Sequence, residues 1–337
     1  MVTLLYKSIK PGIICLAIFV VGLGAYTRLS DSGLGCPDWP ACYGHWYVQK
    51  TIHFPHLSLL DTYKAWTEMI HRYIAGCLGL LIIATLTIES YSKKQQGQNI
   101  PWTYYITLGL LVLQALFGMW TVTWKLHPLA VMPHLLGGMT LTLLISWVFS
   151  SPEKTLDSKL PPQIIRIIWL LFTVICGQVV LGGWTSANYA ALVCPDFPTC
   201  QGKWIPDMQF FEAFSIPPIG PNYDGGALSG AARTAIHVSH RVGGLIAACI
   251  TCYLGVICYQ NLYRLSTSTL RYIIVCIICV STQIILGIAN VLYLLPISIA
   301  VAHNVGALII LLVLARILVN HYRAIAPINP QHHLAIT

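Results

Sequence analysis

The sequence predicts an all-α integral membrane protein in which eight transmembrane helices form two four-helix bundles. Of its 337 residues, 56% are hydrophobic and only 9% are charged, whereas a soluble domain carries about 25% charged residues. Eight apolar runs are long enough to cross a bilayer, which takes about 20 residues. The second half of the chain also repeats motifs of the first half in the same order.

The eight apolar runs define the expected helices. The first run could be mistaken for a secretory signal, but it ends in Gly24-Ala25-Tyr26-Thr27 and the fifth run ends in the similar Gly182-Gly183-Trp184-Thr185. We therefore expect the first run to be retained as a span. Two long loops, about 30–63 and 188–232, are rich in Pro, Gly and Cys. The expected spans are 11–29, 64–88, 101–124, 129–149, 164–187, 233–260, 270–294 and 297–320.

Lys and Arg residues set the expected orientation. They are more frequent in the loops on the side of the N-terminus, whereas most acidic residues lie in the two long loops. The positive-inside rule then predicts that both termini are cytoplasmic (N-in and C-in) and that the long loops are extracytoplasmic. The net charge of +8 does not indicate nucleic-acid binding, because no basic patch is interleaved with aromatic residues. The lack of an Arg- and Ser-rich transit segment favours the inner (cytoplasmic) membrane of a bacterial cell.

Two recurring motifs show that the chain contains an internal repeat. The segment Cys36–Cys42 recurs as Cys194–Cys200, 158 positions later, and His71-Arg72 recurs as His240-Arg241, 169 positions later. The C-terminal half therefore carries an 11-residue insertion in its long loop. Each half has four spans, so both enter the membrane in the same sense, as in a parallel repeat with its pseudo-two-fold axis along the membrane normal. We expect bundles at 1–160 and 161–337, called the N-terminal and C-terminal halves below.

Two histidines recur in each half at matching depth. They are His71 and His134 in the N-terminal half, and His240 and His303 in the C-terminal half. Facing imidazoles on two helices of a bundle can hold a haem iron from both sides. The alternative is interhelical hydrogen bonding by the imidazoles. Zinc fits less well, because it takes three or four ligands and each half offers two.

Other polar residues in the repeat have less specific interpretations. Arg72 and Arg241 directly follow candidate ligands and are candidate partners of haem propionates, with ordinary snorkelling to the interface as the alternative. Gln114 and Gln283 are interpreted as hydrogen bonders between helices. His127 has no histidine at the equivalent position and is interpreted as a loop residue.

The cysteines fall into two groups. Cys36 and Cys42, like Cys194 and Cys200, lie six positions apart in the long loops. In an oxidising compartment such pairs indicate short disulfides, and the rival interpretation is a redox-active thiol pair. The other eight cysteines lie in apolar spans and are interpreted as small hydrophobic side chains.

Glu68 distinguishes the two halves. It lies three positions before His71, so on a helix the two side chains share a face. Its equivalent in the C-terminal half is His237. An ionisable group within a membrane span is costly and by default indicates function. The sequence therefore predicts chemistry in the N-terminal half.

Together these motifs resemble the haem A synthase family over nearly the whole chain. The resemblance depends on the segment from Gly24 to Pro40, on Glu68-Met69-Ile70-His71-Arg72, and on His134, His240 and His303. It implies an enzyme that oxidises a ring methyl of haem O to a formyl group, giving haem A for terminal oxidases.

The resemblance also implies residue roles. His240 and His303 would be the axial ligands of a permanent haem b in the C-terminal half. Haem O, the substrate, would bind between His71 and His134, and Glu68 would be the acidic catalytic residue. The pairs Cys36–Cys42 and Cys194–Cys200 match the loop cysteine pairs of the family. Expected partners are haem O and the lipid bilayer, with haem O synthase, terminal-oxidase assembly factors and a second copy of the chain as further candidates.

Two other classes of protein remain alternatives at this point. A di-haem b-type electron-transfer protein that leaves haem unmodified predicts equivalent bundles, which the pair Glu68 and His237 does not fit. A repeat-built transporter predicts helices broken at the membrane midplane, whereas the polar groups here lie near the outer ends of uninterrupted spans.

Overall fold

The computed structural model describes residues 2–48, 58–149 and 160–325 and is helical over most of these residues. Eight of its helices are long and apolar enough to cross a membrane, which confirms the all-α membrane fold that the sequence predicts. They are α1 (Val2–Leu29), α2 (Leu59–Gln95), α3 (Trp102–Thr123), α4 (Pro128–Phe149), α5 (Pro162–Ala187), α7 (Gly230–Gln260), α8 (Thr267–Leu292) and α9 (Ile297–Ile325). Short helical turns are α6 (Phe210–Ala213) and Leu262–Arg264.

Capping residues extend several helices beyond the apolar runs. At the start of α2, the Ser58 hydroxyl accepts the Asp61 N–H while the Asp61 carboxylate accepts the Ser58 N–H, both at 3.1 Å. Such a capping box satisfies two backbone donors that the first turn would otherwise leave free. Ser229 and Ser266 cap α7 and α8 in a similar way. α2 therefore begins before the span predicted at 64–88, and it also ends later, so that it covers Leu59–Gln95.

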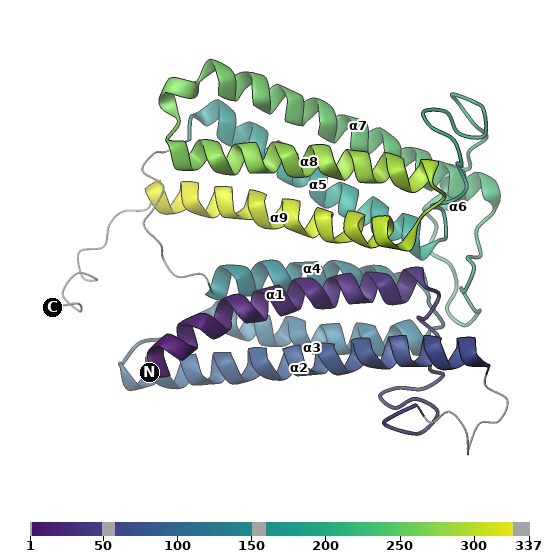
Figure 1. The fold of residues 1–337 in the computed structure, drawn as a ribbon, viewed down its shortest axis with the longest axis horizontal. Coiled ribbons are helices and arrows are strands. Elements are labelled where there is room, and N and C mark those ends of the chain that lie inside the picture. Colours follow the sequence, from purple (N-terminus) through teal and green to yellow (C-terminus); the bar gives the residue numbers. More distant parts are fainter. Residues whose placement is uncertain (1, 49–57, 150–159, 326–337) are drawn as a thin grey trace.

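The helices form two groups, with α1–α4 in one and α5 and α7–α9 in the other (Figure 1). The groups touch mainly where α1 packs against α9 and α4 packs against α5. By the sequence offsets, α1 corresponds to α5 and α4 to α9, so these two contacts are equivalent to each other. The N-terminal end of α1 and the C-terminal end of α9 lie at one end of the molecule, and both cysteine loops lie at the other (Figure 1).

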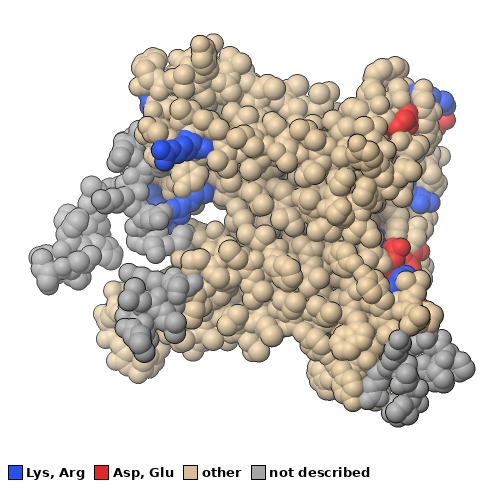
Figure 2. All heavy atoms as spheres, viewed as in Figure 1, with Lys and Arg blue, Asp and Glu red and all other residues tan. Residues whose placement is uncertain are grey.

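Apolar side chains fill the interior of both groups and also cover their outside. Ile168, Leu171 and Leu308 are fully buried in one cluster, whereas Leu80 and Ile278 are exposed. On the face shown in Figure 2, charged side chains lie at the two ends of the molecule and leave an uncharged band between them. Because charge in the hydrocarbon region is costly, this band suits lipid. The chain is a multi-pass membrane protein.

Arg28 joins the two groups at the loop end. Its Nη2 donates to the Ser186 carbonyl at 2.9 Å, and its guanidinium lies over the Tyr189 ring, 4.1 Å from the centroid. Tyr189 in turn donates from its hydroxyl to Asp224. Arg28 and Ser186 are 158 positions apart, so they are equivalent positions of the two repeats.

Candidate functional site

The four repeated histidines meet in two pairs, one in each group of helices. The rings of His71 on α2 and His134 on α4 have centroids 6.5 Å apart and are perpendicular. His240 on α7 and His303 on α9 are 6.4 Å apart with an interplanar angle of 84°. The two pairs thus have nearly the same geometry.

Each imidazole packs against a glycine on a neighbouring helix. A Cβ added to Gly24 would lie 3.0 Å from Cε1 of His71, and one added to Gly182 would lie 3.2 Å from Cε1 of His240. Gly118 contacts His134 and Gly287 contacts His303 in the same way, at 3.2 and 3.1 Å. A larger residue would have to displace the ring, so these four glycines set how closely the helices approach the imidazoles.

One ring nitrogen of each imidazole is buried without a hydrogen bond of good geometry. These atoms are Nδ1 of His71, His134, His240 and His303, considered within the described residues. The backbone of Gln114 comes near His134, and that of Gln283 comes near His303. Two imidazoles that each place a nitrogen about 2 Å from one metal ion have ring centroids about 6 Å apart. Both pairs therefore fit the axial ligation of a haem iron.

Of the two glutamines, Gln283 makes a hydrogen bond to a neighbouring helix, whereas the buried Nε2 of Gln114 has no hydrogen-bond partner among the described residues. Gln283 on α8 donates from Nε2 to the His303 carbonyl on α9 at 2.7 Å, which is a hydrogen bond between helices of the kind expected. Its side chain occupies the space that a Cβ on Gly306 would fill, and Gln114 does the same against Gly137.

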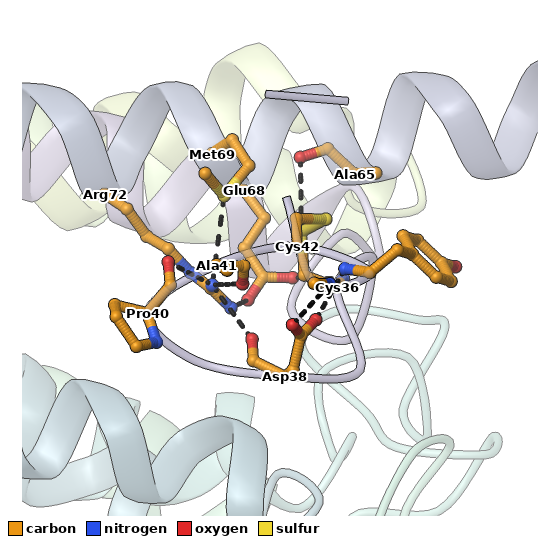
Figure 3. Close-up of a disulfide and its surroundings, with 11 residues drawn as sticks. Cys36, Asp38, Pro40, Ala41, Cys42, Ala65, Glu68, Met69 and Arg72 are labelled. Atoms are coloured by element: carbon orange, nitrogen blue, oxygen red, sulfur yellow. Dashed lines mark hydrogen bonds and ion pairs between the residues drawn. A yellow bond between two sulfur atoms is a disulfide. The ribbon is translucent and has the colours of Figure 1, made fainter. Parts of the chain in front are cut away.

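Glu68 lies between α2 and the first cysteine loop (Figure 3). Its side chain is buried, with 5% of its surface exposed. Oε2 accepts the Cys36 N–H at 2.9 Å, and Oε1 pairs with Nη2 of Arg72 at 2.5 Å. The Arg72 Nη1 donates to the carbonyls of Asp38 and Ala41, at 3.0 and 2.7 Å. The carboxylate is therefore held from both sides, close to His71 in sequence and on the same helix.

The two cysteine loops have the same internal structure. The sulfur atoms of Cys36 and Cys42 are bonded, as are those of Cys194 and Cys200. Asp38 accepts the backbone N–H groups of Tyr43 and Gly44. Asp196 accepts those of Gln201 and Gly202, at positions equivalent to Tyr43 and Gly44.

Hydrogen bonding keeps Asp196 ionised. The Thr199 hydroxyl and the N–H groups of Gly202 and Gln201 lower the pKa of Asp196 to about 2. A carboxylate that accepts several hydrogen bonds favours its charged form. The turn that closes the second cysteine loop therefore carries a fixed negative charge at neutral pH.

Arg241 holds the second cysteine loop as Arg72 holds the first. It donates to the carbonyls of Thr199, Cys194 and Asp196, at 2.8, 3.0 and 2.9 Å. Both guanidinium groups thus bind loop carbonyls, a role that the sequence did not indicate. Pairing with haem propionates stays a prediction. For Arg241 the Nε is buried and, among the described residues, has no hydrogen-bond partner.

His237 occupies the position equivalent to Glu68 and makes a different contact. Its Nδ1 donates to the Ala190 carbonyl at 2.8 Å. Both side chains therefore attach α2 or α7 to its cysteine loop. Only Glu68 brings an acidic group to that place, so the two otherwise similar sites differ in their capacity for acid–base chemistry.

His127 has a role that the sequence interpretation did not include. It lies in the turn before α4, as expected of a loop residue, but its side chain is fully buried. Its ring bonds both to the Leu129 backbone and to the Pro217 carbonyl in the other half. The one available signal was its place directly before Pro128, where a helix begins and a capping side chain is favoured.

Facing imidazoles inside two groups of membrane helices, with a buried carboxylate on one helix of the first pair, are the arrangement expected of a haem-binding membrane protein. Residues 10–315 match the family model COX15-CtaA, described as "Cytochrome oxidase assembly protein", and the chain belongs to this family.

Relatives of the chain carry a common name. A protein named heme A synthase from Shewanella oneidensis is 42% identical over 317 residues, which cover 89% of this chain and 92% of the relative. A protein of that name from Wolbachia pipientis subsp. Culex pipiens is 25% identical over 332 residues, covering 88% and 91%. One from Geobacillus thermodenitrificans is 28% identical over 206 residues, covering 58% and 60%. The resemblance drawn from the motifs is confirmed, and the family implies a haem-binding enzyme.

Proposed function

We propose that this chain is a haem A synthase, an oxidoreductase that converts a ring methyl of haem O into a formyl group. The resulting haem A would serve terminal oxidases. One observation supports this most directly: two nearly identical histidine pairs differ in that Glu68 stands beside the first and His237 beside the second. Similar sites with different chemistry suit one substrate haem and one cofactor haem. The name shared by the relatives agrees with this reading.

In this proposal His240 and His303 hold a resident haem b, and His71 and His134 bind haem O. A resident haem supplies a one-electron redox centre next to the substrate, and oxidation of a methyl group to a formyl group removes several electrons. Glu68 accepts or returns protons at its carboxylate near the substrate edge. Arg72 and the Cys36 N–H fix the direction of that carboxylate, so its orientation costs little when the substrate binds.

We also propose an orientation in the inner membrane of a bacterial cell, with both termini cytoplasmic. Both cysteine loops lie at the same end of the molecule (Figure 1) and both cysteine pairs are bonded, which suits the oxidising extracytoplasmic side. Haem O synthase, assembly factors of terminal oxidases and a second copy of the chain are proposed partners on the strength of the reaction alone.

The test is to express the chain together with a source of haem O and to identify the haems extracted from the membranes. The wild type is expected to yield haem A and haem b. Glu68→Gln keeps the shape and a hydrogen-bond acceptor for the Cys36 N–H but loses the charge, so it is expected to keep haem b and make no haem A.

The choice of glutamine matters, because Glu68→Ala would remove the acceptor of the Cys36 N–H as well as the charge. A buried N–H without an acceptor costs about 1–3 kcal/mol, which would confuse misfolding with lost chemistry. Normal haem A in Glu68→Gln would refute the role of the carboxylate. A wild-type chain that yields no haem A in the presence of haem O would refute the function itself.

The near-identity of the two histidine pairs favours one alternative, a di-haem b-type electron-transfer protein. Their centroid distances differ by only 0.1 Å, 6.5 against 6.4 Å. The same extraction separates the alternatives, since such a carrier would yield no haem A whether or not haem O is supplied.

A further inference from the structure

The outer segment 205–229 of the C-terminal half contains the insertion that the N-terminal half lacks. It is attached to two helices of its own half. The Trp184 indole on α5 donates to the Ala213 carbonyl at 2.8 Å. The Glu212 carboxylate accepts both the N–H and the hydroxyl of Ser229, at 2.7 and 2.6 Å. Ser229 caps α7, so the segment is fixed to the helix that carries His240.

The same segment also crosses to the N-terminal half. Nδ1 of His127 accepts the Leu129 N–H at 3.1 Å, so in the neutral ring Nε2 carries the proton. That Nε2 therefore donates to the Pro217 carbonyl of the segment at 3.1 Å. The Tyr223 N–H donates to the Lys125 carbonyl at 3.0 Å, and the Tyr223 ring lies edge-on to the imidazole at 4.9 Å.

The turn that receives the segment has an equivalent in the other half, which lacks the imidazole. Lys125 and Leu126 have positive φ values of 48° and 60°, and the equivalent Leu294 and Leu295 have 57° and 62°. The two turns therefore have the same backbone shape. Where the first continues with His127, the second continues with Pro296, which has no side-chain donor or acceptor. The insertion in one half is thus matched by a specific contact residue in the other.

The position of this contact bears on the first histidine pair. α4 begins at Pro128, directly after His127, and carries His134 within its first two turns. A contact that fixes the start of α4 also fixes the direction from which His134 approaches His71. The segment is attached to α7 as well, so it connects the helices that carry His240 and His134.

We propose that His127 is a positioning residue through which segment 205–229 holds α4 in place and so sets the affinity of the N-terminal site for haem O. The inference rests on the proposed function, because it takes the pair His71 and His134 as the substrate site. His127 acts through α4 and does not itself touch the substrate. The insertion occurs in one half because it serves the site in the other half.

Two substitutions separate the contact across the halves from the local helix cap. Asparagine at 127 places its amide oxygen near the position of Nδ1, so it can still accept the Leu129 N–H, but it is too short to reach Pro217. Glutamine extends its amide nitrogen toward the Pro217 carbonyl and gives up the cap. The measurement is titration of haem O into the purified full-length protein in detergent, followed by absorbance, with the resident haem b absorbance recorded in the same samples.

His127→Asn is expected to raise the Kd for haem O about tenfold, which corresponds to about 1.4 kcal/mol and is typical of a lost buried hydrogen bond. Its haem b absorbance stays at the wild-type level. His127→Gln is expected to bind haem O nearly as the wild type does. The matched control is His321→Asn, since His321 is also buried and its Nδ1 also accepts a backbone N–H, that of Leu160, at 3.2 Å. It lies at the opposite end of the molecule and is expected to leave the Kd unchanged.

Three results would overturn the proposal. His127→Asn could bind haem O as the wild type does. Weak binding by His127→Gln with normal binding by His127→Asn would assign the residue to the helix cap alone. Loss of haem b in parallel with haem O binding would show a general effect on folding. A failure of the proposed function is distinguishable, because the wild type itself would then leave haem O unconverted.

Discussion

Glu68 and His237 occupy equivalent positions in the two repeats but differ in their chemistry. Each side chain connects its helix to the backbone near a cysteine loop, Glu68 as an acceptor and His237 as a donor. The structural task is therefore met by either residue. The carboxylate also pairs with Arg72, and this ion pair stabilises a charged group that is almost completely buried. A carboxylate that architecture alone does not require is a strong candidate for chemistry.

Substitution of the four histidines is expected to separate them into one pair that binds haem b and one pair that binds haem O. His240→Ala and His303→Ala should each abolish the haem b absorbance of the purified protein, because an iron held from both sides loses one ligand. His71→Ala and His134→Ala should keep that absorbance and fail to bind added haem O. Visible absorption spectra with and without haem O measure both effects. A full haem b spectrum after replacement of both His240 and His303 would contradict the assignment.

Asp196 gives the second cysteine loop a defined dependence on pH. The pKa of Asp196 in the folded protein is about 2, below the usual value of about 3.9, so the ionised form stabilises the fold. That contribution is complete above about pH 4 and is lost as the pH falls toward 2. The difference in thermal unfolding midpoint between wild type and Asp196→Asn should be larger at pH 7 than at pH 3. Equal differences at both values would show that the carboxylate charge does not matter.

How much of the site the sequence could predict depends on whether a contact is repeated. The histidine pairs and both cysteine pairs were found because each occurs twice at a constant offset. The contact of His127 with Pro217 was not, since the residues lie 90 positions apart and occur once. The arginines were found, but their carbonyl partners were not, because backbone acceptors leave no mark in a sequence.

Helices α1 and α5 place a glycine against a histidine ring, and this limits the size of the side chain that each helix can carry there. Gly24→Ala would place a methyl group 3.0 Å from Cε1 of His71. Overpacking of this kind costs about 1–3 kcal/mol, so the variant should bind haem O more weakly and keep its haem b absorbance. Gly182→Ala should show the reverse, because it faces His240 at 3.2 Å.

Gly12→Ala is the matched control on the same helix. A Cβ at Gly12 would meet no atom within 4 Å, and alanine favours a helix over glycine by up to about 1 kcal/mol. This variant should therefore bind haem O and haem b as the wild type does. If Gly24→Ala were equally silent in a haem O titration, the close packing of Gly24 on His71 would have no part in binding.

The helices themselves were predictable in number and approximate place, and their ends were less so. The apolar runs marked all eight spans, since composition alone decides which segments suit lipid. The ends depend on caps and on polar turns that continue the helix into water, such as the Ser58 and Asp61 box at the start of α2. The short helix α6 lies in a loop and has only four residues, so no apolar run predicts it.

At the scale of the molecule, the two histidine pairs lie on either side of one shared interface. α4 carries His134 and packs against α5 and α9, and α9 carries His303. The helices of the two candidate haem sites are therefore direct neighbours. Such proximity suits the transfer of electrons from a substrate in one half to a cofactor in the other.

The contact of Arg28 with Ser186 joins equivalent positions of the two halves, and it shows an advantage of having both halves in one chain. Equivalent positions that meet at a two-fold axis face their own copies when the two partners are identical. Two identical halves would bring arginine against arginine there, and like charges in so close a contact repel. One gene that encodes both copies removes the constraint, because each copy can change alone. Arginine on one side and serine on the other is an asymmetry that a homodimer could not have acquired.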